Sequence, residues 1–290
     1  MDDGVARALL VEQLPEYADL RLRRVASGGT DNAVFRLGDE LALRLPLRLS
    51  AVSGLLKEIR WLPSLAPHLT LEVPEFVDAG RPTSTFELPW AVLRWLPGED
   101  ALTAGLDCAQ DAADSLARFV RELQAVPTTG APAPGAAGFV RGMPLAHWDD
   151  AVREALTRCG GLLDAARVAA VWDDAVAAAA YEGPPVWLHA DLIPGNVLLR
   201  DGRITGILDF GALAIGDPAY DVTPAWHLLD ASGRDNFRDL IGVDDATWRR
   251  ARGIVVALAA FALPYYRDSN PAMMRTARRG VEQVLSDLPD

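Results

Sequence analysis

The order of apolar and polar positions divides the chain into a β-rich first part and a helical second part. Residues 21–46 form short apolar runs around a glycine-rich loop and a Gly-Asp turn, which predicts three antiparallel strands. Residues 51–66 instead carry leucine and isoleucine at helical spacing. Runs at 74–80 and 89–95 predict two further strands. We therefore expect a first lobe with a five-stranded antiparallel sheet and one helix.

Segment 96–100, Leu-Pro-Gly-Glu-Asp, breaks this pattern as a hinge would. Helical periodicity predominates beyond it, and the strongest β signal is a hairpin at 196–210 with Asp201-Gly202 at its turn. The other expected segments are a helix at 111–126, a Pro/Gly/Ala-rich loop at 127–138, two helices within 145–181 that separate near Gly160, and three or four helices from about 220 to 288.

Length and charge narrow the class of protein. A chain of 290 residues, half of them hydrophobic, can bury a large core. We assign an α+β architecture in two lobes, with an N-terminal lobe at 1–97 and a mainly helical C-terminal lobe at 98–290. The net charge of −12 argues against a nucleic-acid partner, because a phosphate backbone requires a basic surface. It permits a cationic substrate, although acidic surfaces also simply keep proteins soluble.

Nothing in the sequence indicates a membrane protein or an oligomeric state. The longest apolar run, 254–264, is too short to span a bilayer and is typical of a buried helix. The first residues lack the basic start and apolar core of a secretory signal. Cys108 and Cys159 stand far apart and outside any motif, so neither a disulfide framework nor a zinc site is expected. A cytoplasmic location fits these features best.

The predicted hairpin brings two oxygen-bearing side chains to its open end. A two-residue turn pairs Arg200 with Arg203. Continuing that register pairs Asn196 with Ile207, so Asp209 lies diagonally across from Asn196, about 7–8 Å away. An amide oxygen and a carboxylate at that spacing can share one or two hard cations.

Asp191 adds a third oxygen-bearing side chain, from a loop five residues before Asn196. Phosphoryl transfer requires this set of groups: a metal that neutralises the phosphates, and a carboxylate that orients and deprotonates the attacking hydroxyl. We therefore expect Asp191 to act as the catalytic base, with Asn196 and Asp209 as metal ligands.

Three motifs carry a family resemblance. His189-Ala190-Asp191-Leu192-Ile193-Pro194-Gly195-Asn196 resembles the kinase catalytic loop, and Leu208-Asp209-Phe210-Gly211 resembles the metal-binding Asp-Phe-Gly element. The segment 216–221, Gly-Asp-Pro-Ala-Tyr-Asp, is similar to the one that follows in aminoglycoside phosphotransferases. The chain thus resembles that family, strongly within 186–224 and weakly elsewhere.

The resemblance implies a bilobal protein-kinase-like fold with its catalytic loop within 186–211. It also implies an enzyme that moves the γ-phosphoryl group of ATP or GTP, with Mg²⁺, to a hydroxyl of a small molecule. His189 would be a packed scaffold residue, and Asp221 would brace the catalytic loop from behind. Asp217 precedes a proline, as an N-cap residue does.

The nucleotide would lie against the first lobe. Ser27, Gly28, Gly29 and Thr30 stand between two predicted strands, where backbone N–H groups can cradle phosphates. An ordinary hairpin turn has the same composition.

By resemblance, Arg44 takes the place of the kinase phosphate-pairing lysine, with Glu58 as its ionic partner. Lys57, the only lysine, is expected at the surface. Residues 90–98 resemble the strand and hinge against which the base packs. Leu93 would border that pocket, and the Arg94 carbonyl and Leu96 amide would bond the base edge.

The acceptor would lie among the helices of 145–181 and 225–288. That region holds acids that could pair with ammonium groups, and aromatic residues that could stack on rings; both residue types are also common on solvated faces and in cores. The candidates are Asp149, Asp150, Asp230, Asp235, Asp239, Asp244, Asp245, Asp268, Trp148, Trp226, Tyr265 and Tyr266.

Three readings of the function remain. An antibiotic phosphotransferase (aminoglycoside, macrolide or nucleoside type) leads. A metabolite kinase acting on homoserine, methylthioribose or a choline-like alcohol would use the same motifs. A nucleotide-binding pseudokinase should have lost Asp191, Asn196 or Asp209, and all three are present. A protein kinase is disfavoured, because no Ala-Pro-Glu-like activation segment follows Asp-Phe-Gly.

Overall fold

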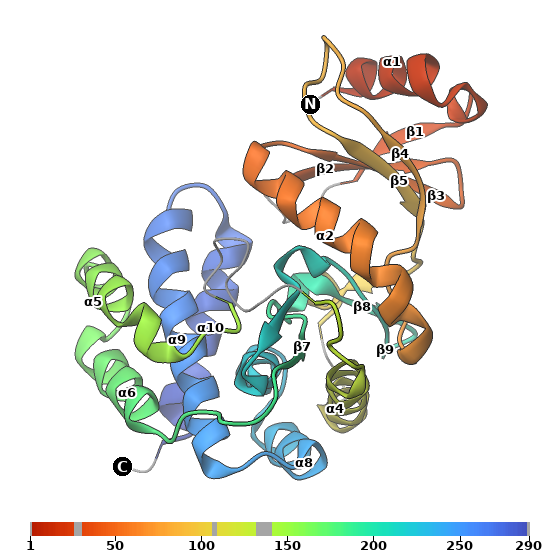
Figure 1. Cartoon of the computed structure of the whole chain (residues 1–290). Helices are drawn as coiled ribbons and strands as arrows, with labels where there is room; N and C mark the ends of the chain where they lie inside the picture. The colour runs from red at the N-terminus through yellow and green to blue at the C-terminus, as the bar shows by residue number, and fades with distance from the viewer. Residues whose placement is uncertain (1, 26–30, 106–108, 132–140, 289–290) are drawn as a thin grey trace.

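A five-stranded antiparallel sheet organises the first part of the chain (Figure 1). The computed structural model describes residues 2–25, 31–105, 109–131 and 141–288. The strands are β1 (Leu22–Arg24), β2 (Asn32–Leu37), β3 (Leu41–Pro46), β4 (Phe76–Gly80) and β5 (Trp90–Arg94), in the order β1-β2-β3-β5-β4. The predicted antiparallel sheet is confirmed.

Two helices cover opposite faces of this sheet, α1 (Asp3–Gln13) and α2 (Leu49–Leu65). Because side chains alternate along a strand, Trp90 and Val92 pack in the cluster that includes α1, whereas Ala91 and Leu93 pack with α2. The expected single helix of this lobe is α2. Helix α1 was not predicted, because only three of its residues are buried: Ala6, Leu9 and Leu10.

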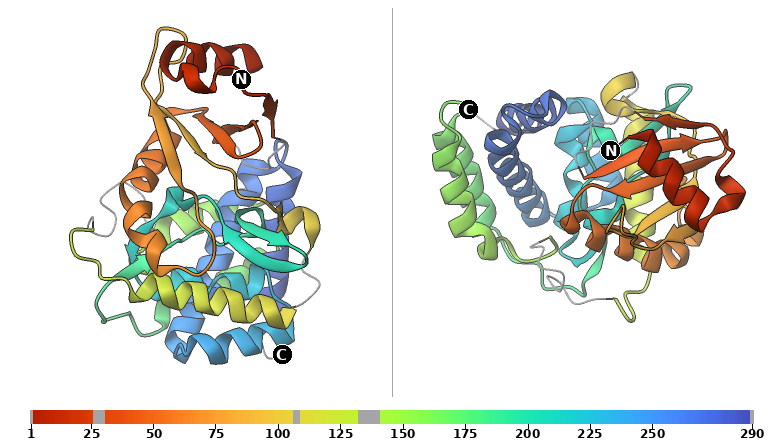
Figure 2. Two further views of the ribbon diagram at one scale, coloured as in Figure 1. Left: turned by 90° about the vertical axis from the view of Figure 1, so that its right-hand side faces the viewer. Right: turned by 90° about the horizontal axis from the view of Figure 1, so that it is seen from above.

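The second part of the chain is mainly helical and shares one large core. Its helices are α3 (Ala101–Ala104), α4 (Ala109–Ala125), α5 (Asp149–Arg158), α6 (Ala165–Ala177), α7 (Pro224–His227), α8 (Ala231–Ile241), α9 (Asp245–Tyr266) and α10 (Pro271–Ser286). The apolar run at 254–264 lies inside α9, which packs against α5, α6 and α10. Seen from above, α9 and α10 stand between the green helices and the sheet (Figure 2). No helix in the described ranges combines the length and apolarity that a membrane span requires.

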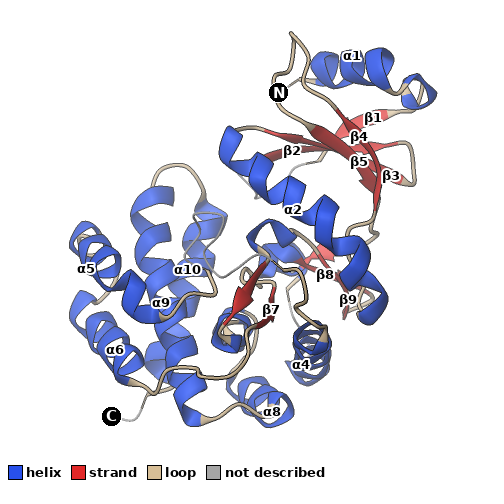
Figure 3. Ribbon diagram, viewed as in Figure 1, coloured by secondary structure: helices blue, strands red, loops and turns tan. Residues whose placement is uncertain are grey.

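Short strands and turns lie between the sheet and the helices (Figure 3). The strands are β6 (Glu99–Asp100), β8 (Val197–Arg200) and β9 (Arg203–Ile207) in one sheet, and β7 (Val186–Leu188) and β10 (Ala214–Gly216) in another. The expected hinge at 96–100 therefore ends in a strand. The 3₁₀ helices are η1 (Pro15–Tyr17), η2 (Ala66–His68), η3 (Leu145–Trp148), η4 (Pro194–Asn196), η5 (Phe210–Ala212) and η6 (Pro218–Val222).

The β8–β9 hairpin departs from the predicted register at one point. Arg200 pairs with Arg203 as expected, but Val197, and not Asn196, pairs with Ile207. The cause is a bulge that adds Thr205 to β9. The Thr205 carbonyl accepts the N–H of Glu72 at 2.9 Å, so the bulge ties the hairpin to the segment that follows α2.

Candidate active site

The catalytic-loop motif begins where β7 ends, and its backbone is bent sharply at Ala190. This residue has φ 61°, a left-handed conformation that is uncommon for a residue with a side chain. The buried Asp221 carboxylate stabilises the bend, because its two oxygens accept the N–H groups of His189 and Ala190, each at 2.7 Å. Asp221 thus contacts the loop as the resemblance implied.

Burial raises the pKa of Asp221 to about 7, and the two N–H groups oppose this shift. Since the ordinary value is 3.8, the folded chain binds more protons than the unfolded chain between about pH 4 and 7. The carboxyl group therefore contributes most stability at the acid end of that window, and its contribution falls as the pH rises towards 7.

Replacing Asp221 with asparagine should reduce the free energy of unfolding by about 1–3 kcal/mol near pH 5, because one backbone N–H loses its acceptor. The difference in free energy of unfolding between the two proteins should shrink towards pH 8, because burial penalises the ionised carboxylate of the wild type but does not affect the neutral asparagine. Urea unfolding at both pH values measures it, and Asp201→Asn at the exposed hairpin turn is the control. A loss that grew with pH would contradict the protonation argument.

His189 connects the catalytic loop to the end of β9. Its Nδ1 accepts the N–H of Asp191 at 3.2 Å, and its Nε2 lies 3.0 Å from the Leu208 carbonyl oxygen. The ring must therefore carry its proton on Nε2, and burial lowers its pKa, which favours this neutral form. His189 is fully buried, so its contacts are those of a scaffold residue.

The Asp191 side chain is held by two neighbours and remains open to solvent. Asn196 Nδ2 donates to Asp191 Oδ2 at 3.2 Å and to the Asp191 carbonyl at 2.9 Å. Arg141 donates to Asp191 Oδ1 at 3.1 Å and also to the Ala190 carbonyl. With 28% of its side chain exposed, Asp191 can receive a proton from a bound molecule. Arg141 was not predicted, because it lies in a loop without a recognisable motif.

Asp209 lies beside this pair at the end of the hairpin. The Leu208 N–H donates to the Asn196 carbonyl at 2.8 Å, which keeps Asn196 and Asp209 at the same end. Asp209 has a left-handed backbone (φ 59°), and its Oδ1 accepts the Gly211 N–H at 3.2 Å. Its side chain is 47% exposed.

The residues present fit a magnesium ion that is shared with nucleotide phosphates. Because the Asn196 amide nitrogen is turned towards Asp191, the amide oxygen is the atom left for a cation. In the described parts of the chain, no three His, Cys, Asp or Glu side chains form a metal site by themselves. A cation here would therefore complete its coordination with phosphate or water oxygens, as Mg²⁺ commonly does.

Arg44 extends the site into the first lobe. The Arg44–Glu58 ion pair implied by the resemblance is present, and both side chains are buried where β3 faces α2. Burial raises the pKa of Glu58 above its ordinary range, whereas Arg44 opposes the shift. Arg44 Nη2 also lies 3.7 Å from Asp209 Oδ1, which connects the sheet to the proposed metal ligand.

Helix α2 also contacts the turn after Asp209. A Cβ atom on Gly54 would lie 3.0 Å from the Gly211 Cα, so the two backbones approach closely only because Gly54 has no side chain. The expectation of a surface position for Lys57 is wrong: it is partly buried, and its Nζ donates to the Leu213 carbonyl at 3.0 Å. The reason is that the turn covers this face of α2.

The other predicted nucleotide contacts are less defined. Ser27, Gly28, Gly29 and Thr30 lie outside the described residues. Leu93 packs against Leu55 and Ala91, and Leu93, Arg94 and Leu96 do not line the cavity described below. Their contact with the base remains a prediction.

Asp217 caps η6 as expected, since its Oδ1 accepts the Ala219 N–H at 3.0 Å. It also has a partner that the sequence did not reveal. The buried Arg250 of α9 binds both of its oxygens, at 2.6 and 3.1 Å. Asp217 therefore anchors the segment after the Asp-Phe-Gly turn to α9.

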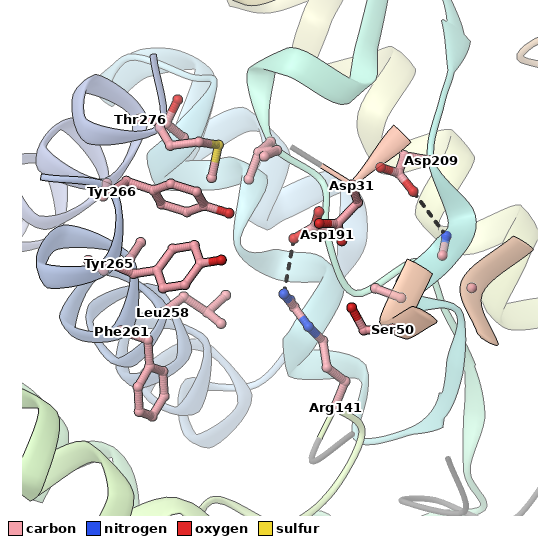
Figure 4. A pocket seen from close by; sticks show the side chains of 18 of the residues that line it. Asp31, Ser50, Arg141, Asp191, Asp209, Leu258, Phe261, Tyr265, Tyr266 and Thr276 are labelled. Atoms are coloured by element: carbon pink, nitrogen blue, oxygen red, sulfur yellow. Dashed lines mark hydrogen bonds and ion pairs between the residues drawn. The ribbon is translucent and has the colours of Figure 1, made fainter. Parts of the chain in front are cut away.

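A cavity of about 810 Å³ lies where these elements meet. Asp191, Asp209 and Arg44 line it from one side. Figure 4 shows Tyr265 and Tyr266 of α9, with Leu258 and Phe261, facing Asp191 and Arg141 across the cavity. The predicted catalytic base, one predicted metal ligand and two of the predicted acceptor contacts therefore line one cavity.

Most of the residues expected to contact the acceptor do not line this cavity; only Tyr265 and Tyr266 do. Several acids have other roles: Asp230 and Asp244 cap α8 and α9, and Asp149 binds Arg153 and Trp172. Trp148 and Trp226 are buried in the core. Of α5 and α6, only Arg158 reaches the cavity lining, because these helices pack against α9 elsewhere.

Comparison with known proteins agrees with this arrangement. A sequence profile of the phosphotransferase enzyme family matches residues 22–254. A search of curated proteins gave no match. The GDP complex of aminoglycoside 2'-phosphotransferase-IIIa is similar over 99% of this chain and 100% of that one, with 21% identity and a TM-score of 0.77.

Two further structures extend the comparison. A GDP and kanamycin complex of APH(2")-IIia has 23% identity, a TM-score of 0.76 and 97% coverage of each chain. Macrolide 2'-phosphotransferase from Brachybacterium faecium has 25% identity and a TM-score of 0.62, over 98% of this chain and 99% of that one. The bilobal kinase-like fold is thereby confirmed, and since the profile spans most of the sequence, the chain belongs to the phosphotransferase enzyme family.

Proposed function

We propose that this enzyme transfers the γ-phosphoryl group of ATP or GTP to a hydroxyl group of an antibiotic. One observation carries the proposal: Asp191, Asp209 and Arg44 line a single cavity between the sheet and the helices. Similar structures contain GDP with kanamycin, or ATP with streptomycin, which supports a purine nucleotide and a hydroxyl-bearing antibiotic as the substrate pair.

Asp191 would accept the proton of the attacking hydroxyl. Asn196 and Arg141 fix its carboxylate, so the oxygen that receives the proton is already oriented before substrate binds. Positioning of this kind accounts for much of the rate enhancement in phosphoryl transfer, where the protein performs little covalent chemistry.

Asn196 and Asp209 would hold Mg²⁺, which neutralises negative charge on the phosphates when it is bound. Arg44 supplies a further positive charge near Asp209, and Glu58 restricts where that charge can lie. The phosphate end of the nucleotide is thereby directed towards Asp191.

The similar structures favour an antibiotic over a small metabolite, because they include aminoglycoside complexes and macrolide phosphotransferases. The cavity, at about 810 Å³, has room for an acceptor beside the phosphate end of the nucleotide. The pseudokinase alternative is disfavoured because Asp191, Asn196 and Asp209 are all present. Asn196 contacts Asp191, and Asp209 accepts the Gly211 N–H.

The purified chain should turn over ATP or GTP faster when a suitable antibiotic is added, and the antibiotic should gain the mass of one phosphate. A panel of aminoglycosides, macrolides, nucleoside antibiotics and small alcohols tests this, with mass spectrometry of the products. Nucleotide binding without any acceptor-dependent turnover would instead indicate a pseudokinase. Phosphorylation of a small alcohol alone would indicate a metabolite kinase.

A further inference from the structure

The cavity wall that faces Asp191 is mainly apolar. It is built from one side of α9 and the first turns of α10 (Figure 4). Its residues are Leu258, Ala259, Phe261, Ala262, Pro264, Tyr265 and Tyr266 on α9, and Met273, Thr276 and Ala277 on α10. A molecule that fills the cavity must place a broad apolar surface against this wall.

The charges around the cavity do not suit a polycation. The carboxylates in the described lining are Asp31, Asp191 and Asp209, and each pairs with an arginine, at 3.1, 3.1 and 3.7 Å respectively. All three lie outside α9 and α10. Arg141 and Arg158 also line the cavity. A molecule with several ammonium groups would lose their hydration here without gaining paired carboxylates, which is costly.

His227 is a buried polar residue of the cavity lining whose ring nitrogens lack a partner, as does the Asn32 side-chain oxygen. It is the last residue of α7, is only 4% exposed and lines the cavity. Neither ring nitrogen forms a hydrogen bond of normal geometry, although the Thr276 backbone lies close enough to raise the pKa. Burial lowers the pKa to about 4, so the ring is neutral and offers one donor and one acceptor.

The position of the ring is fixed by α10. A Cβ atom on Gly280 would lie 2.8 Å from the His227 Cε1, so α10 packs directly on the imidazole. A buried polar group without a hydrogen bond reduces stability. The chain keeps such a group in the cavity lining, with both nitrogens covered by neighbouring atoms, so a bound molecule must displace those atoms to satisfy it.

We propose that the acceptor is a hydroxyl compound with a largely apolar body, and that one of its hydroxyl or carbonyl groups hydrogen-bonds to His227. The α9–α10 wall would contact the apolar body, and polycationic acceptors would bind poorly. The inference rests on the proposed function, because it assigns the acceptor side of the same cavity.

The test compares a macrolide, which is a large lactone with few charges, with the polycation kanamycin. Direct binding is measured by calorimetry, and turnover is measured with ATP and GTP. We expect the wild type to bind and phosphorylate the macrolide in preference to kanamycin. Preference for kanamycin, or binding of neither, would overturn the inference. Absence of turnover with a macrolide that binds would count against the proposed phosphotransferase function only.

His227→Leu should weaken macrolide binding about tenfold, as expected for one neutral hydrogen bond. His227→Gln, which keeps a donor and an acceptor, should recover part of the affinity. The nucleotide dissociation constant should not change in either variant, and His147→Leu at an exposed position is the control. Unchanged macrolide affinity in His227→Leu would remove His227 from the proposal.

The melting temperature of the variant shows whether His227 binds the acceptor or only stabilises the fold. Because His227→Leu removes a buried polar group without a partner, the ligand-free variant should melt at the same temperature as the wild type or higher. A lower melting temperature together with weaker nucleotide binding would show that His227 is structural.

A second pair of variants tests the charge argument. Leu258→Asp and Leu258→Asn have nearly the same shape and differ in charge. If kanamycin is rejected because the wall lacks carboxylates, only Leu258→Asp should bind kanamycin more tightly than the wild type does. Equal effects of the two variants would contradict the argument.

Discussion

Replacing Asp191 with asparagine should reduce the turnover number about 10²–10⁴-fold, the usual effect of losing a general base. An asparagine retains the shape, and its single amide oxygen can accept from Arg141 or from Asn196 but not from both. It cannot accept the hydroxyl proton. The nucleotide dissociation constant should change little, since Asp191 faces the acceptor side of the cavity. Steady-state kinetics with a saturating acceptor, together with nucleotide titration, measure both quantities.

Asp201→Asn is the matched control for this experiment. Asp201 is an exposed carboxylate at the tip of the same hairpin, with a left-handed backbone that asparagine also tolerates. Its replacement should leave turnover unchanged. Near-wild-type turnover of Asp191→Asn would remove the residue from the chemistry.

Asp209→Ala should abolish most activity, with a loss of at least about 10²-fold, because a metal ion at transferring phosphates contributes several kcal/mol. Asn196→Ala should lose less, since an amide supplies an oxygen without negative charge. Activity of the wild type should disappear in a chelator and return with Mg²⁺ or Mn²⁺. Titration of each variant with Mg²⁺ and nucleotide measures the effect.

Asp209→Asn distinguishes loss of metal binding from disruption of the turn that Asp209 stabilises. Its side-chain oxygen can still accept the Gly211 N–H, so the turn should remain folded while the charge is lost. We expect this variant to melt like the wild type and to require far more Mg²⁺. Full activity of the wild type in excess EDTA would exclude the metal role of both residues.

The sequence predicted the spatial arrangement of Asp191, Asn196 and Asp209 well, because these residues are close together in the chain. The loop from His189 to Asn196 and the turn at Asp209 are joined by one hairpin. The Asp201-Gly202 turn therefore predicted the pairing of the two strands, with an error of one residue at the open end of the hairpin. The error was the bulge at Thr205, whose carbonyl accepts a hydrogen bond from Glu72, a residue more than 100 positions away in sequence.

The acceptor side could not be predicted in the same way. The run at 254–264 is apolar on all sides, so its periodicity does not show that Leu258 and Phe261 line a cavity while Ile254 and Val255 are buried. The acids were candidates because carboxylates could pair with the ammonium groups of a substrate. In the structure several of them cap helices or pair with arginines, which are local roles that net charge does not reveal.

The contact between Gly54 and Gly211 also bears on how the enzyme is switched on. Protein kinases control activity by moving the helix that carries the ion-pair glutamate, and an activation segment determines its position. In this chain α2 rests directly on the turn after Asp209, and the Arg44–Glu58 pair is formed. Backbone-to-backbone packing of α2 on that turn therefore holds Glu58 in place, a task that protein kinases give to the activation segment. Such an enzyme would be active from the moment it is synthesised, and substrate supply would set its rate.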